Sequence, residues 1–167
     1  MEGNELKGLL QEIRKELEPV LKKSGTVFYS GRQTLGNGNF YLMGLNPGGD
    51  PSEDTIGASL EKWEEYRPDW SAYIHDHWTK TLGNEGNAQH QRNVRYLCEE
   101  VLNESSTNMF SANAVFLRSQ NFSKLEISGE FLSQCWKLHV RFLREVKPRV
   151  LICLGNGPES SFDLVRE

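Results

Sequence analysis

Two asparagines in this sequence follow or interrupt apolar runs, where a polar side chain needs a partner or a ligand. Asn46 comes after the run at residues 40–43 and lies in a turn rich in glycine and proline, GLNPGGDP, at residues 44–51. Asn113 lies inside a second run, MFSANAVFL, at residues 109–117. A side-chain amide carries both donors and an acceptor, and it must be hydrogen-bonded when it is buried. Glycines in such a turn let backbone N–H groups approach a ligand.

The elements that must position these amides follow from the hydrophobic pattern. Helices are expected where apolar residues recur at helical spacing, over residues 5–23, 55–66, 69–78 with Asp69 as the N-cap, 89–102 and 128–146, with a last helix from about Glu159. Strands are expected at residues 26–29, 40–45, 109–117 and 149–154. Near-continuous apolar strands that alternate with helices are typical of a parallel sheet covered on both faces. We therefore predict one α/β domain over residues 1–167, a three-layer α/β/α sandwich with a mainly parallel sheet.

Polar turns follow three of these strands. The first turn contains Asn46. The second is the loop at residues 118–121, after the strand of Asn113, and the third runs from Gly155 to Pro158. The carboxyl ends of parallel strands meet at one edge of a sheet, and ligands bind there. We therefore expect Asn46 and Asn113 to face one pocket, although a turn without a ligand remains the alternative for residues 44–51.

Composition bounds the class of protein. No apolar run approaches the roughly 20 residues that span a bilayer. The amphipathic first residues are not those expected of a secretory leader, so we expect a cytoplasmic protein with no membrane contact. Three cysteines lack metal-site spacing and are predicted to be free and buried, namely Cys98, Cys135 and Cys153. His75 and His77 do not share a helix face, which argues against a metal. The sequence therefore predicts neither a metal nor a cofactor.

Charge is uneven along a chain whose net charge is −4. Residues 50–69 hold seven acidic and two basic side chains, whereas residues 118–149 hold seven basic and three acidic ones. A nucleic-acid-binding protein needs a basic surface rather than a basic total. The pattern therefore neither requires nor excludes DNA, and two solvated helix faces would give the same pattern.

Three segments resemble the uracil-DNA glycosylase superfamily. Residues 44–48, GLNPG, are similar to the G-[IM]-N-P-G motif of its mismatch-specific and single-strand-selective branches. Residues 108–113, NMFSAN, resemble the strand that ends in a base-reading asparagine, and residues 150–155 resemble the strand before the last active-site region. The likeness covers roughly residues 40 to 156 and implies the fold of that superfamily.

The resemblance implies a hydrolase of base excision repair that binds DNA containing a damaged or mismatched base. Such an enzyme flips the base from the stack, and water then cuts the N-glycosidic bond. On this likeness Asn46 is the catalytic residue and orients the water. Backbone N–H groups near Gly48 hold the base O2, and Asn113 reads the O4 and N3 edge.

The same resemblance supplies the remaining candidates. The base-binding set adds Gly44, Leu45 and Pro47. Three further candidates are Asp50, Phe110 and Arg118, and the aromatic residue that stacks on the base is one of Trp63, Tyr66, Trp70 and Phe110. His139 lies on the apolar stripe of its helix and is expected to be structural.

The family usually carries a later loop with a histidine, and this sequence reaches Glu167 without that motif. We therefore expect that the natural chain continues or that a partner chain covers the sheet edge beside residues 149–154, and that this form has weak or no glycosylase activity. Two alternatives remain. One is a catalytically inactive superfamily member that binds nucleic acid or a nucleotide. The other is an unrelated α/β enzyme for a small phosphorylated substrate held at residues 155–158.

Overall fold

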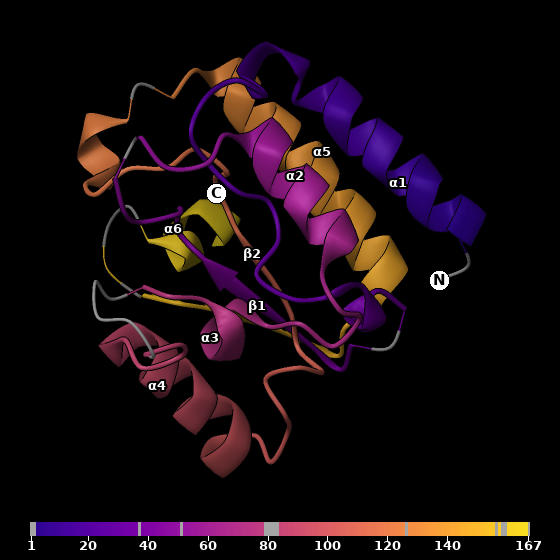
Figure 1. Ribbon diagram of the computed structural model, residues 1–167. Helices are drawn as coiled ribbons and strands as arrows, with labels where there is room; N and C mark the ends of the chain where they lie inside the picture. Colours follow the sequence, from indigo (N-terminus) through magenta and orange to yellow (C-terminus); the bar gives the residue numbers. More distant parts are fainter. Residues whose placement is uncertain are drawn as a thin grey trace.

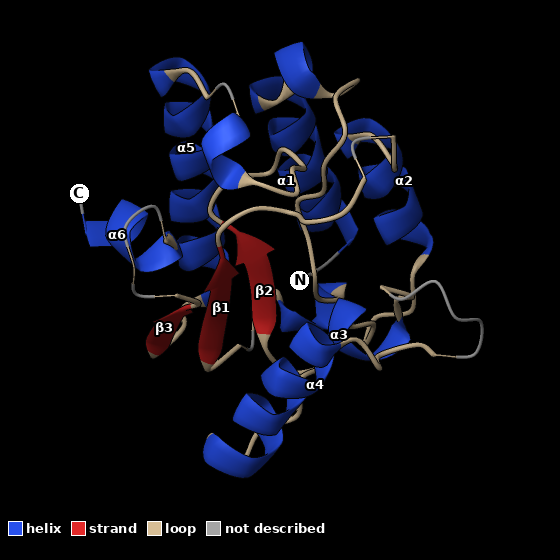
Figure 2. Ribbon diagram, turned by 90° about the vertical axis from the view of Figure 1, so that its left-hand side faces the viewer, coloured by secondary structure: helices blue, strands red, loops and turns tan. Residues whose placement is uncertain are grey.

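The computed structural model describes residues 3–36, 38–50, 52–78, 84–125, 127–155, 157 and 160–166. Its described part contains a three-stranded parallel sheet with the strand order β2-β1-β3; β1 and β2 are labelled in Figure 1 and all three strands in Figure 2. The strands are β1 (Phe40–Gly44), β2 (Phe110–Asn113) and β3 (Val150–Cys153). The prediction of three adjacent parallel strands is confirmed, but β2 ends at Asn113, before the predicted end of the strand at residue 117.

Helices lie on both sides of the sheet (Figure 2). Those on one side are α1 (Gly3–Glu16), α2 (Ile56–Glu65) and α5 (Gly129–Val146), those on the other are α3 (Ala72–His75) and α4 (Gln89–Tyr96), and α6 (Ser161–Arg166) follows β3. Successive strand residues point to opposite faces. Tyr41 and Met43 therefore belong to one apolar cluster with α1 and α5, whereas Leu42 belongs to a second cluster with Val94 of α4.

Helix α5 begins and ends where the sequence predicts. The Ser128 side chain accepts a hydrogen bond from Phe131 N at 3.1 Å, which caps the first turn. Lys147 takes a left-handed conformation with φ of 50°, and Pro148 cannot continue the helix. Helix α2 is capped in the same way by Thr55. These caps are local, so the sequence reveals them.

The first helix is shorter than predicted. It ends at Glu16, and Pro19 lies in a separate 3₁₀ turn, η1 (Glu18–Val20), because proline has no N–H to continue an α-helix. The strand predicted at residues 26–29 is wrong. Within this segment only Phe28 forms an isolated antiparallel bridge, to Ala112, and the preceding Gly25 forms another, to Leu117.

Two further helix predictions need correction. Asp69 caps no helix, because its carboxylate binds Arg67, and only the short α3 forms within residues 69–78. The helix predicted at residues 89–102 changes to a π-helical turn, η3 (Leu97–Val101), after α4. The short 3₁₀ turns η2 (Arg32–Thr34) and η4 (Phe122–Lys124) lie in loops.

Strand β3 lies at an edge of the described sheet, and its first residue, Val150, is 45% exposed. A partner chain at this edge stays a prediction. Cys98 and Cys135 are buried, Cys153 is half-buried, and all three are free. None of the helices in the described ranges is long and apolar enough to cross a bilayer.

Candidate functional site

A cleft with a volume of about 840 Å³ opens at the carboxyl ends of β1 and β2. Its walls come from the loops that follow these two strands, from α2, and from the segment that contains α3. Asn46, Gly48 and Asn113 line it together. The structure thus brings the principal residues of the sequence prediction into one cavity.

The amide of Asn46 is held in one orientation. Its Nδ2 donates to the carbonyl oxygen of Pro47 at 2.9 Å and to that of Ser119 at 3.0 Å. A carbonyl oxygen can only accept, so the nitrogen of the amide must face these two groups. In the described part of the chain no donor bonds Oδ1 of Asn46, and this acceptor is left for a water molecule or a ligand.

Asn113 crosses the end of β1. Gly44 is its register partner in the sheet, and a Cβ added to Gly44 would lie 2.1 Å from Asn113 Oδ1. Only glycine leaves room for this side chain. The Asn113 residue is 8% exposed, and its side chain contacts the hydroxyl of Tyr29.

Tyr29 is fixed both by its backbone and by its ring. Its N–H donates to Ser111 O at 2.9 Å, and its carbonyl accepts from Ala72 N at 2.9 Å. The ring lies 6.1 Å from that of Tyr73 and 5.8 Å from that of Trp78, measured between centroids. Burial raises the pKa of Tyr29 to about 12, against the opposing charge of Arg118. The hydroxyl is therefore protonated at neutral pH.

Aromatic rings form two walls of the cleft. On the α2 side, Tyr66 and Trp70 stack with their centroids 4.4 Å apart, and Trp63 stacks on Phe28 at 4.2 Å. A second aromatic group that lines the cleft consists of Tyr29, Tyr73, Trp78 and His90. Aromatic faces in a cleft suit a planar ring as a ligand, because rings gain stability by offset stacking. Three of the four predicted stacking candidates, Trp63, Tyr66 and Trp70, line the cleft.

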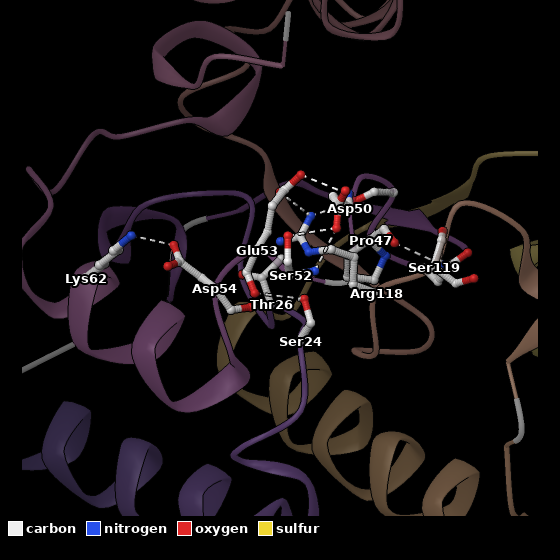
Figure 3. Close-up of polar contacts among 12 residues, drawn as sticks. Ser24, Thr26, Pro47, Asp50, Ser52, Glu53, Asp54, Lys62, Arg118 and Ser119 are labelled. Carbon is white, nitrogen blue, oxygen red and sulfur yellow. Dashed lines mark hydrogen bonds and ion pairs between the residues drawn. The ribbon is translucent and has the colours of Figure 1, made fainter. Parts of the chain in front are cut away.

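The mouth of the cleft carries charges of both signs (Figure 3). Lys62 pairs with Asp54, and Arg118 Nη1 lies 3.0 Å from Glu53 Oε2. Deeper in the cleft, burial raises the pKa of the Asp76 carboxyl. The sequence did not single out Tyr29, Glu53 or Asp76, because no local pattern marks a residue that acts through a distant segment.

The other sequence candidates are placed as follows. Asp50 and Arg118 line the cleft. Leu45 and Pro47 act through their carbonyls, which accept from Val115 N and Ser119 N at 2.9 Å each.

Phe110 lies outside the cleft, which corrects its candidacy for stacking on a base. It is 1% exposed and packs in the core against Tyr41 and Phe142, with ring centroids 4.7 and 5.4 Å away. Its position near the start of β2 separates it from the carboxyl ends of the strands. Pro51, Asn156 and Pro158, which the sequence placed in functional turns, lie outside the described residues.

Within the basic stretch at residues 118–149, Arg118 lines the cleft, whereas two basic residues of α5 bind acidic residues of α1 instead. Arg141 of α5 pairs with Glu12 of α1 at 3.1 Å, and Lys137 pairs with Glu16 at 3.5 Å. These ion pairs join two helices on one side of the sheet. Lys137 and Arg141 therefore contribute to the packing of α5 against α1.

Comparison of the chain with models of protein families, with curated proteins and with solved structures found no match. Within the described ranges, no group of three or more histidine, cysteine or acidic side chains is placed to hold a metal ion. The chemistry of the cleft and the sequence resemblance are the basis for a function.

Proposed function

We propose that the protein is a uracil-DNA glycosylase-like hydrolase with the three-layer α/β/α fold of that superfamily, acting on uracil or a related deaminated base in DNA. One observation carries the proposal. The amide nitrogen of Asn46 is held by two carbonyls, so its oxygen remains as an acceptor in a cleft that also contains Asn113. An oriented water molecule and a base-reading amide are the two parts that hydrolysis of a selected base requires.

In this mechanism Asn46 Oδ1 accepts a hydrogen bond from a water molecule and directs it at C1′ of the flipped nucleotide. The bond from C1′ to the base nitrogen breaks while the water oxygen bonds to C1′. The bonding electrons leave with the base, and the proton lost by water passes to solvent or to the departing base. The sugar develops positive charge before water adds fully, so an amide suffices where a strong base is absent.

Recognition of the base divides between its edge and its faces. Asn113 offers a donor and an acceptor to the edge that distinguishes uracil from cytosine. The walls containing Tyr66, Trp70 and Trp78 offer stacking surfaces, which are worth about 1–3 kcal/mol per base in single-stranded complexes. The contact of Tyr29 with Asn113 holds the reading amide in place.

The test is a panel of labelled oligonucleotides that contain uracil, hypoxanthine, xanthine or a thymine mismatch, as single and double strands. Each is incubated with excess protein, so that a single turnover is enough for detection, and abasic sites are scored by alkaline cleavage. We expect cleavage of the uracil strand and none of an otherwise identical thymine strand.

The same panel separates the alternatives. Binding of the oligonucleotides without release of any base would favour a superfamily member that does not cleave. Crystals soaked with uracil or with a nucleoside phosphate would then show which ligand the cleft takes. Occupation by the phosphorylated compound alone, at residues 155–158, would favour the unrelated enzyme and overturn the glycosylase proposal.

A further inference from the structure

Arg118 spans the mouth of the cleft from the loop after β2 to the loop after β1 (Figure 3). Its Nη1 donates to Gly48 O at 2.5 Å and binds Glu53 Oε2 at 3.0 Å. The Arg118 side chain is only 12% exposed, and its buried Nε has no hydrogen-bond partner among the described residues. This guanidinium therefore has more donor capacity than its present partners use.

The carboxylate of Glu53 occupies a position built for an anion. Its second oxygen, Oε1, accepts from the backbone N–H of Asp50 at 2.9 Å. Gly49 makes this approach possible, because its φ is +101° and a Cβ at this residue would lie 2.6 Å from Glu53 Oε1. We call Gly49, the Asp50 N–H and the Arg118 guanidinium the anion cradle.

Backbone N–H groups and a guanidinium are also the donors that hold phosphate oxygens in proteins. A phosphate presents more acceptor oxygens and more charge than a carboxylate, so it can replace Glu53 at both Arg118 Nη1 and the Asp50 N–H. We propose that the anion cradle is a phosphate-binding site, and that the Glu53 carboxylate occupies it until a phosphate group displaces it. The inference rests on the proposed function for the source of that phosphate, which is the DNA backbone beside the flipped base.

Glu53 can leave at little cost. Its side chain is 51% exposed, so water can solvate the released carboxylate, and the incoming phosphate replaces it as the counter-ion of the largely buried Arg118. Release of the carboxylate into water opens the cradle next to Asn46 and Gly48, so phosphate binding and base binding occur side by side. The alternative is that Glu53 only fastens the loop, in which case its removal would weaken or leave unchanged the binding of any anion.

The test uses Glu53→Gln, which retains the shape of the side chain and removes its charge. The probes are inorganic phosphate and a short single-stranded oligonucleotide without uracil, each titrated at fixed low salt. We expect binding to tighten about fivefold, which is about 1 kcal/mol, because the competing internal anion is lost. Asp54→Asn is the matched control, since it removes one negative charge from the next residue, which pairs with Lys62 instead of Arg118. It should change affinity less than about twofold.

A double variant shows whether Arg118 mediates the gain. With Arg118→Ala, or Arg118→Lys if the alanine variant is unstable, Glu53→Gln should no longer improve binding. A gain with both probes, or with either one, supports the cradle and identifies free phosphate, backbone phosphate or both as its ligand. Unchanged affinity for both probes, or an equal gain in Asp54→Asn, overturns the proposal. These titrations involve no base release, so a failure of the glycosylase proposal in the oligonucleotide panel would be seen separately.

Discussion

His139 contacts Ala114, and the preceding residue, Asn113, lines the cleft. The polar groups around His139 and those in the cleft are satisfied in opposite ways. His139 is fully buried, with Nδ1 2.6 Å from the Tyr41 hydroxyl and Nε2 3.0 Å from Ala114 O. Both ring nitrogens therefore have partners within the protein. Its place in the core confirms the structural role predicted for it.

The cleft contains polar atoms that the described residues leave unsatisfied. These are Oδ1 of Asn46 and Nε of Arg118. Another nitrogen of Arg118, Nη1, binds the half-exposed carboxylate of Glu53. A closed network stabilises one conformation, whereas an open one retains hydrogen-bonding capacity for a ligand. The comparison separates a polar group that stabilises the fold from polar groups available for chemistry.

The largest effect is expected from replacing His139, which binds both the Tyr41 hydroxyl and Ala114 O in the core. His139→Leu leaves the Tyr41 hydroxyl and Ala114 O buried without their partner, and each unsatisfied group costs about 1–3 kcal/mol. We expect the free energy of unfolding at pH 7, measured with urea, to fall by about 3 kcal/mol. His77→Leu, at a side chain that is 45% exposed, should change it by less than about 0.5 kcal/mol. Equal stability of the two variants would contradict the structural role.

Acid should weaken the same network. Burial lowers the pKa of His139 from 6.5 to about 4, so the folded protein resists a proton that the unfolded chain accepts. This contribution to stability is complete above pH 6.5, falls as the pH drops toward 4, and then stays constant. The loss is at most about 3 kcal/mol, since one unit of pKa equals about 1.4 kcal/mol. Urea unfolding across this range should show a steeper decline in the wild type than in His139→Leu.

A somewhat smaller effect is expected for Asn46→Ala. It should slow base release by about 10²-fold, which raises the activation free energy by about 2.7 kcal/mol. The reason is the loss of the acceptor that orients water. Single-turnover rates with excess protein give the measurement, and Asn93→Ala, at an exposed asparagine of α4, is the control. If Asn46→Ala and wild type release uracil at the same rate, the proposed mechanism is wrong.

The smallest effect concerns the orientation of Asn113. Tyr29→Phe removes the hydroxyl that contacts this amide, and the preference for uracil over cytosine should fall about fivefold, or about 1 kcal/mol. Tyr73→Phe is the matched control, because its hydroxyl lies 2.9 Å from Ser111 Oγ instead. Competition assays with the two bases give the ratio. An equal loss in both variants would show that the aromatic cluster, and not the contact with Asn113, determines the preference.

The parts of the fold predicted correctly from sequence depend on local signals. Strands β1, β2 and β3 are short apolar runs bounded by turns, and α5 has both a serine cap and a proline after its end. The segment at residues 26–29 differs, because it forms an isolated antiparallel bridge from Phe28 to Ala112 instead of a strand. Tertiary contacts determine this conformation, and the local sequence does not encode them.

The candidate site divides in the same way. Asn46 and Asn113 could be found because each follows or interrupts an apolar strand. Tyr29 and Glu53 could not, since the first acts through Asn113 and the second through Arg118, both far away in the sequence. Their importance appears only when the loops after β1 and β2 are placed side by side.

The space that Asn113 occupies beside Gly44 also constrains how the protein can evolve. Any larger residue at position 44 would collide with an amide only 2.1 Å from the site of its first side-chain atom. A lineage can therefore enlarge residue 44 only after residue 113 has become smaller, and the reverse order passes through a damaged intermediate. We therefore expect residues 44 and 113 to vary together among any relatives of this chain.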